Sequence, residues 1–198
     1  MANHRIRLVT REDCPRVLDV YAPYITDSTT SFEYEVPTLS AFTDRVMEIR
    51  SFYPYLVFEE NGVVEGFAYA SQFRVRAAYR YDVEASIYLS TASSGRRVGT
   101  ALYTALFRLL SAMNIINVYI GITLPNEAST RLHASFGFSP IGTYRKTGYK
   151  MGQWLDVAWY EKTLGSHSAS PPAVVPVDGL DRAFVEKTFR ECEALVRT

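Results

Sequence analysis

The stretch YLSTASSGRRVGTAL, residues 88–102, decides the fold of this chain of 198 residues. It joins the end of a predicted strand to a loop containing Gly95, Arg96 and Arg97, and then to the start of a predicted helix. Backbone N–H groups at a helix N-terminus lack intrahelical partners and carry the positive end of the helix dipole. They can bind a phosphate or diphosphate, to which arginines would add charge-assisted donors. Taken alone, the pattern also fits a solvated turn.

Hydrophobic periodicity predicts strands and helices on both sides of this stretch. Before it we expect a strand at 6–8, helices from Thr10 and from Thr38 or Ser40, and strands at 55–59, 63–71 and 81–89. After it we expect a helix from Gly99, a strand at 117–123, a short helix from Asn126 to Gly137, and strands at 141–147 and 155–162. This order predicts an α+β domain with a mixed sheet.

The composition changes after Gly165. We interpret residues 1–165 as the main domain, 166–180 as a linker rich in Ser, Ala and Pro, and 181–198 as a helical appendage. The appendage has an apolar stripe that could pack on its own domain or face a partner. Its members are Val185, Phe189, Cys192 and Val196. We expect removal of residues 166–198 to leave the function of the main domain intact.

Charge and composition narrow the classes of function. Acidic and basic residues balance, so no overall field favours nucleic acid or an anionic membrane. No apolar stretch reaches the ~20 residues that a membrane span needs, and the N-terminus lacks the apolar region of a secretory signal. Cys14 and Cys192 fit no metal or redox spacing, so we expect no metal and reduced thiols in the cytoplasm.

A second helix start follows the strand at 117–123. Asn126 is well suited to cap this helix. It could serve only as that cap, or its amide could also reach a cofactor lying between the two helices.

Several stretches resemble one family in number and order. They include SFEYEVP (31–37), FRVRAAYR (73–80), VEASIYL (83–89), LPN (124–126), LH (132–133) and GYKMGQWLD (148–156). Together they resemble the GNAT superfamily and, within it, the phosphinothricin acetyltransferase group, over residues 6–164. The resemblance implies a mostly antiparallel mixed sheet flanked by helices, an N-acetyltransferase that uses acetyl-CoA, a small amino-acid-like amine as acceptor, and a homodimer.

The resemblance places the acetyl-CoA pyrophosphate in the loop before the third helix. The family pattern there is Gln or Arg, two residues, Gly, one residue, then Gly or Ala, so Ser94 and Arg97 depart from it. Arg97 could crowd the phosphates, or Arg96 and Arg97 could compensate with charge, which leaves open a non-catalytic acyl-CoA-binding homologue. The implied cofactor-binding residues are Ile87, Tyr88, Leu89, Gly95, Arg96, Arg97, Val98, Gly99, Thr100 and Asn126. A backbone N–H near Leu89 would stabilise the oxyanion.

Two residues are candidates for proton transfer. Glu84 stands where the group's proposed general base lies, and a carboxylate held near apolar groups has a raised proton affinity. His133 matches the group's His, at a position where many family members carry Tyr. It could assist as an acid or base, since an unperturbed imidazole titrates near ~6.5. The alternatives are an ordinary strand Glu and a packing His.

The resemblance also implies acceptor-binding residues. Arg74 and Arg76 precede Glu84, and Arg76 and Tyr79 match positions associated with the acceptor's acidic groups. A guanidinium pairs bidentately with a carboxylate or phosphinate, so these residues favour an amine that also carries an anion. Phe32 could wall the acceptor pocket. Phosphinothricin, methionine sulfone or sulfoximine, ordinary amino acids, and a protein or peptide N-terminus all stay open as acceptors.

Overall fold

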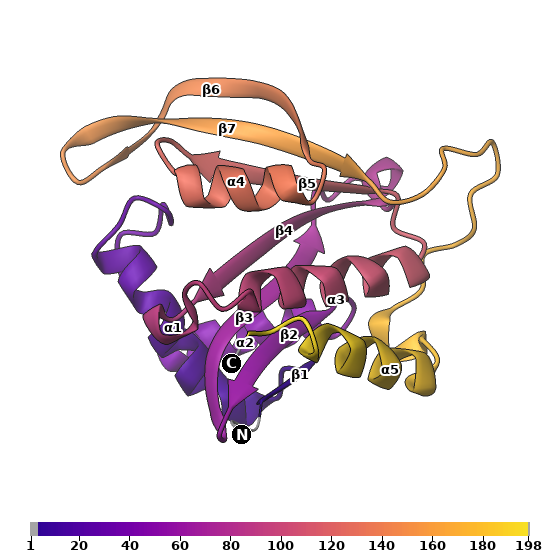
Figure 1. The fold of residues 1–198 in the computed structure, drawn as a ribbon. Helices are drawn as coiled ribbons and strands as arrows, with labels where there is room; N and C mark the ends of the chain where they lie inside the picture. Colours follow the sequence, from indigo (N-terminus) through magenta and orange to yellow (C-terminus); the bar gives the residue numbers. More distant parts are fainter. Residues whose placement is uncertain (1–3, 198) are drawn as a thin grey trace.

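The computed structural model describes residues 4–197, in which a seven-stranded sheet carries helices on both faces (Figure 1). Its strand order is β1-β2-β3-β4-β5-β7-β6, and only β4 and β5 run parallel. The strands are β1 (His4–Leu8), β2 (Tyr55–Glu60), β3 (Val63–Gln72), β4 (Asp82–Leu89), β5 (Asn117–Thr123), β6 (Ser139–Lys150) and β7 (Gln153–Thr163). The helices are α1 (Cys14–Thr26), α2 (Leu39–Arg50), α3 (Val98–Ala112), α4 (Glu127–Ser135) and α5 (Arg182–Glu193). The predicted α+β class with a mixed, mostly antiparallel sheet is confirmed.

Local signals set most of the element boundaries. The Thr38 hydroxyl accepts the Ala41 N–H at 3.3 Å and so caps α2. Asn61 and Gly62 both take positive φ in the turn between β2 and β3, as expected of an Asn-Gly hairpin. Strands β6 and β7 run beyond their predicted ends, because β6 is largely exposed and its pattern there carries little burial signal.

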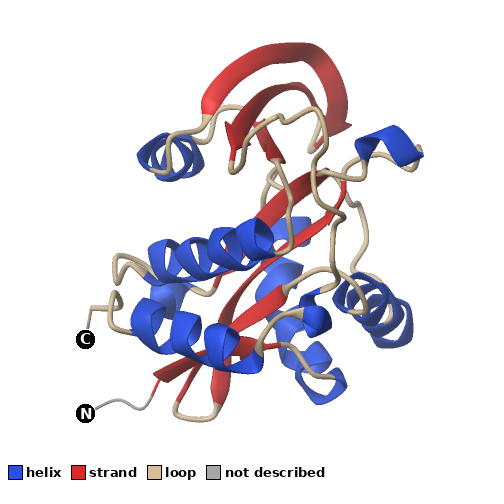
Figure 2. Cartoon of the chain, turned by 90° about the vertical axis from the view of Figure 1, so that its right-hand side faces the viewer, coloured by secondary structure: helices blue, strands red, loops and turns tan. Residues whose placement is uncertain are grey.

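The two faces of the sheet have separate cores. Helices α1 and α2 cover one face, and α3 with α5 covers the other (Figure 2). Helix α3 is the most deeply buried helix, with Leu102, Leu106, Leu109 and Leu110 all inaccessible to solvent. The position of α3 fixes where its N-terminus points, and this determines the site described below.

The segment predicted as a linker is bonded to the domain along its path. The Val175 N–H donates to the Met113 carbonyl at 3.1 Å, and the Val177 N–H donates to the Phe52 carbonyl at 2.9 Å. Asp178 forms an ion pair with Arg50 at 2.8 Å. These contacts hold residues 171–180 against the ends of α2 and α3.

Helix α5 packs on its own domain, alongside α3 and against β1 (Figure 1). Phe189, Cys192 and Val196 are each at most 9% exposed and belong to the same apolar cluster as α3. Removing residues 166–198 would expose this cluster to water. Loss of the segment should therefore destabilise the fold, while the function of a truncated chain that still folds stays a prediction.

Candidate functional site

Strands β4 and β5 part after a short paired stretch. Their parallel pairing runs from Asp82 with Asn117 to Glu84 with Tyr119. The rest of β4 pairs only with β3, so its backbone from residue 85 onward faces a gap on the β5 side. Such a splay leaves unpaired strand N–H and C=O groups available to an extended ligand.

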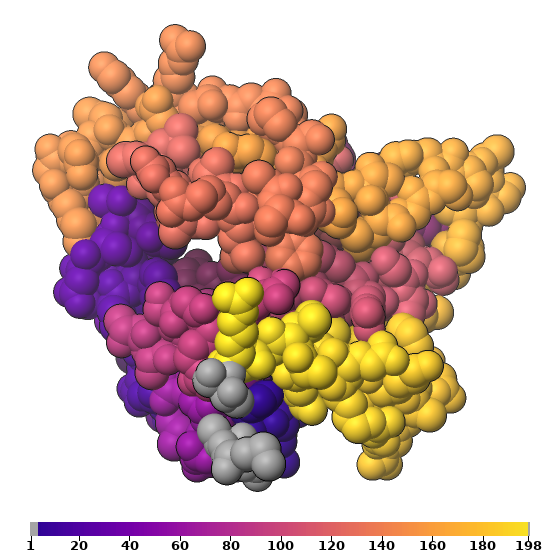
Figure 3. All heavy atoms as spheres, viewed as in Figure 1, coloured from indigo at the N-terminus to yellow at the C-terminus, as the bar shows by residue number. Residues whose placement is uncertain are grey.

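A cavity of about 490 Å³ lies at this splay. Ile87, Leu89, Ser94, Asn126 and Leu132 are among the residues that line it. The volume falls in the range of ordinary ligand sites, about 300–1,000 Å³. Figure 3 shows a hollow between the orange region of α4 and the magenta region at the start of α3. The structure therefore brings together the predicted residues of β4 and the predicted cap of α4.

The loop before α3 adopts a conformation that favours glycine although arginine occupies it. Arg97 has φ 63° and ψ 17°, in the left-handed region, and stands directly before the helix. Gly95 also has positive φ. The Arg97 side chain does not cap the helix, so the first-turn N–H groups of Val98, Gly99 and Thr100 keep their capacity to bind an anion. Arg97 therefore does not prevent the backbone from adopting the turn that the family pattern requires.

The side chain of Arg96 is committed elsewhere. Its guanidinium pairs bidentately with Glu60, with Nη1 at 2.7 Å from Oε2 and Nη2 at 2.5 Å from Oε1. This hydrogen-bonded pair lowers the pKa of Glu60. The expectation that Arg96 supplies a direct donor to a pyrophosphate is therefore corrected: in this structure the charge is already neutralised by a carboxylate.

Sequence reasoning missed Tyr24 of α1. Its hydroxyl donates to the Leu89 carbonyl at 2.6 Å and accepts the Leu89 N–H at 3.2 Å. We expected a backbone N–H near Leu89 to stabilise an oxyanion; the N–H of Leu89 itself is bonded to this hydroxyl, and the wider expectation stays a prediction. Tyr24 and Leu89 are far apart along the chain, so no local pattern indicated the contact. The Tyr88 ring packs edge-to-face on Tyr24 at 5.0 Å between centroids.

Asn126 fulfils the capping role predicted for it. Its side-chain oxygen accepts the Ser129 N–H at 3.1 Å at the start of α4. The same residue lines the cavity at the splay. The two alternatives left open by the sequence are therefore compatible, since the amide can cap α4 with its oxygen and still border the cavity.

Glu84 is the last residue of β4 that pairs with β5. It lies opposite Ser71 of β3. Side chains alternate along a strand, so Ser71 shares a face with Phe67 and Tyr69, which pack with α1 and α2. The Glu84 side chain therefore lies on the face of the sheet that α1 and α2 cover. Burial raises the pKa of the Glu84 carboxyl above its ordinary value, and the charge of Arg74 opposes that shift. A carboxylate in this state can accept a proton near neutral pH more readily than an exposed one.

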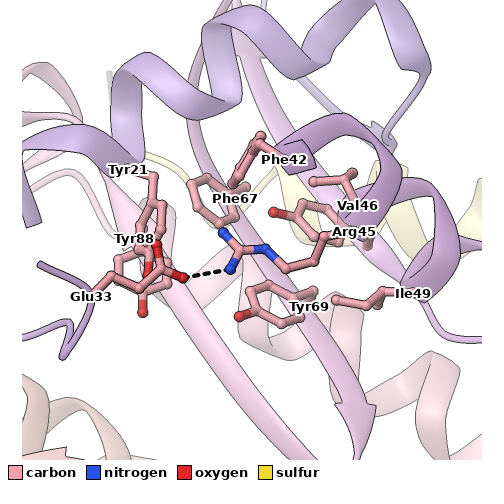
Figure 4. A pocket seen from close by; sticks show the side chains of 10 residues that line it. Tyr21, Glu33, Phe42, Arg45, Val46, Ile49, Phe67, Tyr69 and Tyr88 are labelled. Carbon is pink, nitrogen blue, oxygen red and sulfur yellow. Dashed lines mark hydrogen bonds and ion pairs between the residues drawn. The ribbon is translucent and has the colours of Figure 1, made fainter. Parts of the chain in front are cut away.

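A small pocket of about 80 Å³ opens on the same face of the sheet (Figure 4). Its aromatic wall includes Tyr55, Tyr69 and Tyr88, and Arg45 reaches across it to pair with Glu33. Tyr69 lies opposite Ser86, which comes two residues after Glu84 in β4 and therefore lies on the same face of the sheet. The charge of Glu84 also contributes to the raised pKa of Tyr69, after burial as the main cause. The pocket and the carboxylate are therefore neighbours.

The predicted acceptor residues fall into separate places. Arg74 interacts electrostatically with Glu84. Arg76 and Tyr79 lie in the exposed turn between β3 and β4, where the rings of Tyr79 and Phe73 are T-shaped with 6.2 Å between their centroids. Of these three residues, only Arg74 has a charge that affects the pKa of Glu84.

Phe32 lies in the loop after α1 and packs on β6. A Cβ atom added at Gly148 would come within 2.2 Å of the Phe32 ring, so only glycine allows this approach. The buried Lys150 ammonium holds the loop by donating to the Ser31 carbonyl at 2.5 Å and the Ile25 carbonyl at 2.7 Å. The β6–β7 hairpin therefore sets the position of Phe32, which remains 38% exposed.

His133 lies inside the interface between α3 and α4. It is 4% exposed, its Nε2 accepts from the Tyr103 hydroxyl at 2.9 Å, and its Nδ1 donates to the Ser129 carbonyl at 2.8 Å. Burial lowers its pKa to about 4, against a smaller opposing effect of the Ser129 carbonyl. The imidazole is therefore neutral at pH 7 and both nitrogens are occupied. This corrects the expectation that His133 can exchange protons near neutrality.

Comparison with known proteins agrees with this geometry. Residues 6–159 match the family model described as an acetyltransferase (GNAT) domain. The chain belongs to the GNAT acetyltransferase family. This GNAT chain is 36% identical over 167 residues to a phosphinothricin N-acetyltransferase of Streptomyces coelicolor, an alignment that covers 82% of this chain and 98% of the relative.

Other similar proteins support the same family. An L-methionine sulfoximine/L-methionine sulfone acetyltransferase of Salmonella typhimurium is 31% identical over 175 residues, covering 83% of the GNAT chain and 96% of the relative. The crystal structure of a GNAT superfamily phosphinothricin acetyltransferase from Sinorhizobium meliloti, in complex with AcCoA, matches with a TM-score of 0.83 at 33% identity, covering 89% and 97%. The family resemblance inferred from the sequence is confirmed.

The described part of this GNAT acetyltransferase lacks two kinds of feature. Among residues 4–197, no group of three or more His, Cys, Asp or Glu side chains could hold a metal ion. Within the same residues, no helix has the length and apolar character to span a membrane.

Proposed function

We propose that this chain is an acetyl-CoA-dependent N-acetyltransferase whose acceptor is a small amino-acid-like amine. One observation carries the proposal: β4 separates from β5 directly after the buried Glu84, and the resulting cavity is lined by the loop that leads into α3 and by the start of α4. A carboxylate with raised proton affinity and an anion-binding helix N-terminus thus border the same splay.

The proposed mechanism is direct transfer from acetyl-CoA to the amine. Acetyl-CoA supplies the activated acyl group as a thioester. The first-turn amides of α3 would hold its diphosphate, and Asn126 would border its path. Glu84, directly or through water, would take a proton from the acceptor's ammonium and free the nitrogen lone pair for attack. The amide bond would then form as the C–S bond of the thioester breaks, and the departing thiolate would take up the proton that the attacking nitrogen loses. Cys14 and Cys192 are buried, so we propose no covalent enzyme intermediate.

The proposed acceptor carries an anionic group beside its amine. The charge of Arg74 lowers the pKa of Glu84 against the effect of burial, and Arg76 and Tyr79 occupy the adjoining turn, where they are open to a ligand. A guanidinium at this edge favours carboxylates, phosphinates and similar groups. The names of the relatives, which acetylate phosphinothricin and methionine sulfoximine or sulfone, support the same class. Phe32 would wall the acceptor from the side of β6.

An acetylation screen tests the proposal. The purified chain would be mixed with acetyl-CoA and a panel of free amino acids, phosphinothricin, methionine sulfone, methionine sulfoximine and short peptides, and release of the CoA thiol followed. We expect thiol release with one or more of the small amino-acid analogues. Release only with peptides would support a protein or peptide acetyltransferase instead. Acetyl-CoA binding without release on any amine would support a non-catalytic acyl-CoA-binding protein.

We also propose that the enzyme is a cytoplasmic homodimer. The β6–β7 hairpin exposes large apolar side chains that a monomer would leave in water. They are Ile141, Tyr144, Tyr149, Met151 and Trp154, each 49–62% exposed. The free thiols of Cys14 and Cys192 are consistent with a reducing compartment. Light scattering of the purified chain should give twice the mass of 22.4 kDa, and replacement of Trp154 by a charged residue should restore the single mass.

A further inference from the structure

The loop between β4 and α3 is tied to the β2–β3 hairpin at its first end. The Ser90 N–H and the Ser93 hydroxyl both donate to the Glu65 carbonyl, at 2.8 and 3.1 Å. The Ser90 hydroxyl also bonds the Glu65 carboxylate. These contacts fix where the loop leaves β4, but they lie before the turn that opens α3.

The second end of the loop is held through Arg96. Its guanidinium pairs bidentately with Glu60 at the end of β2, and both side chains are mostly shielded, at 25% and 16% exposure. Its backbone carbonyl accepts the Arg197 N–H at 2.9 Å, and its Nε donates to the Arg197 carbonyl at 3.2 Å. Figure 3 shows the yellow C-terminal end lying against the magenta segment before α3. Arg96 is therefore held by β2 on one side and by the C-terminal segment on the other.

The residue that follows needs such support. Arg97 occupies the left-handed region, which glycine adopts freely and arginine does not. A non-glycine residue keeps that conformation when surrounding contacts impose it. Val196, only 9% exposed, anchors the C-terminal segment in the core just before its contact with Arg96. This segment lies beyond residues 6–159, which match the family model.

We infer that Glu60 and the backbone of Arg197 are positioning residues for the acetyl-CoA diphosphate. By holding Arg96 they impose the turn at Arg97, and the turn aims the first amides of α3. The family pattern has glycine at position 97, which adopts this turn freely. Here the contacts of the C-terminal segment hold Arg97 in the same turn. The inference rests on the proposed acetyl-CoA site and adds residues to it that touch no ligand.

Two acetyl donors separate a positioning role from a general structural one. Acetyl-CoA carries the diphosphate, whereas S-acetylpantetheine has the same thioester without it. Glu60→Gln should raise the KM for acetyl-CoA at least ~5-fold, the lower end of usual coupling between sites. The KM for S-acetylpantetheine and the kcat at saturating donor should change less than about twofold. Glu191→Gln is the matched control, because Glu191 pairs with Arg108 and holds α5 on α3 without touching the loop.

The C-terminal contact has its own matched pair. Ending the chain at Val196 removes the backbone of Arg197, and should raise the KM for acetyl-CoA in the same donor-selective way. Arg197→Ala keeps the N–H and C=O groups that bond Arg96 and should leave both KM values unchanged. Adding Arg97→Gly to Glu60→Gln should restore the KM for acetyl-CoA, since glycine takes the turn without help. If Glu60→Gln fails to fold, the chain ending at Val196 and its control Arg197→Ala still test the inference.

Several results would overturn the inference. An equal rise in KM for both donors would show that Glu60 stabilises only the fold. An unchanged KM for acetyl-CoA would remove Glu60 from the site, and a lowered one would make Arg96 a phosphate ligand that Glu60 restrains. Equal use of both donors by the unaltered enzyme would contradict the diphosphate site itself, and with it the inference.

Discussion

The splay beside Glu84 and the α3–α4 interface around His133 each hold one residue predicted to transfer protons, and the two environments are opposite. At the splay, burial raises the pKa of Glu84, and only the nearby Arg74 works against it. In the interface, burial lowers the pKa of His133 to about 4, and Tyr103 and Ser129 occupy its ring nitrogens. Burial primes the carboxylate to accept a proton and keeps the imidazole neutral. A titratable residue in the expected segment therefore takes part in chemistry only if the groups around it leave it free to exchange a proton.

The largest effect should come from the splay. Glu84→Gln removes the proton acceptor while keeping size and polarity, and should lower turnover at neutral pH by roughly 10²-fold or more. Steady-state kinetics with the best acceptor from the screen would measure it. Unchanged turnover would remove Glu84 from the mechanism, and neither buried residue would then be a proton acceptor.

A change at His133, in the interface between α3 and α4, should affect the free energy of unfolding rather than turnover. His133→Ala leaves a cavity and strips the Tyr103 hydroxyl of its buried partner, so we expect a loss of about 2–4 kcal/mol in the free energy of unfolding. The folded variant should keep kcat within about threefold of the unaltered enzyme. Urea unfolding and kinetics at a temperature where the variant is folded would check both. A catalytic loss near that of Glu84→Gln, with unchanged stability, would restore His133 as a catalytic residue.

Tyr103→Phe tests the hydrogen bond between Tyr103 and His133 from its other end. It leaves the His133 Nε2 without its donor inside the core, and should cost about 1–2 kcal/mol of unfolding free energy without affecting kcat. Because Tyr103 and His133 share one hydrogen bond, their losses should not add in the double variant. Additive losses would show that the two side chains act independently.

The smallest effect should come from the loop at the start of α3. Arg97→Gly relieves the left-handed conformation but makes the unfolded chain more flexible, so the free energy of unfolding should rise by at most about 1 kcal/mol. Thermal unfolding of the two proteins would measure the difference. A clear loss of stability would mean that the Arg97 side chain makes contacts that outweigh the strain.

Much of the fold was predictable because its signals are local. The Asn61-Gly62 turn, the Thr38 and Asn126 caps and the order of the elements each depend on neighbouring residues. The contacts that the sequence did not indicate join residues distant along the chain: Tyr24 with Leu89, Arg96 with Glu60, and Arg96 with Arg197. Spacing and periodicity carry no information on such pairs.

The site was predictable only in part, for a related reason. The family resemblance gave the identity of Glu84 and His133, but their chemistry depends on which side chains surround them in the fold. Arg96 illustrates the same limit: an arginine in a basic loop predicts a phosphate ligand, but the carboxylate with which Arg96 pairs, that of Glu60, comes from β2. The Ser- and Pro-rich stretch after residue 165 reads as a linker, because its bonds to Met113 and Phe52 leave no periodic pattern.

The pH dependence of catalysis tests the contrast between Glu84 and His133 most directly. The acceptor's own ionisation cancels in the ratio of kcat/KM for the unaltered enzyme to that for Glu84→Gln, measured across the pH range. Since Glu84 acts only when deprotonated and burial raises its pKa, the ratio should fall as pH decreases, through a midpoint above the ordinary pKa of a glutamate carboxyl. A ratio that stays flat with pH would show that Glu84 is not the proton acceptor. If the ratio depends on pH only when a His133 variant takes the place of Glu84→Gln, His133 would be the proton acceptor instead.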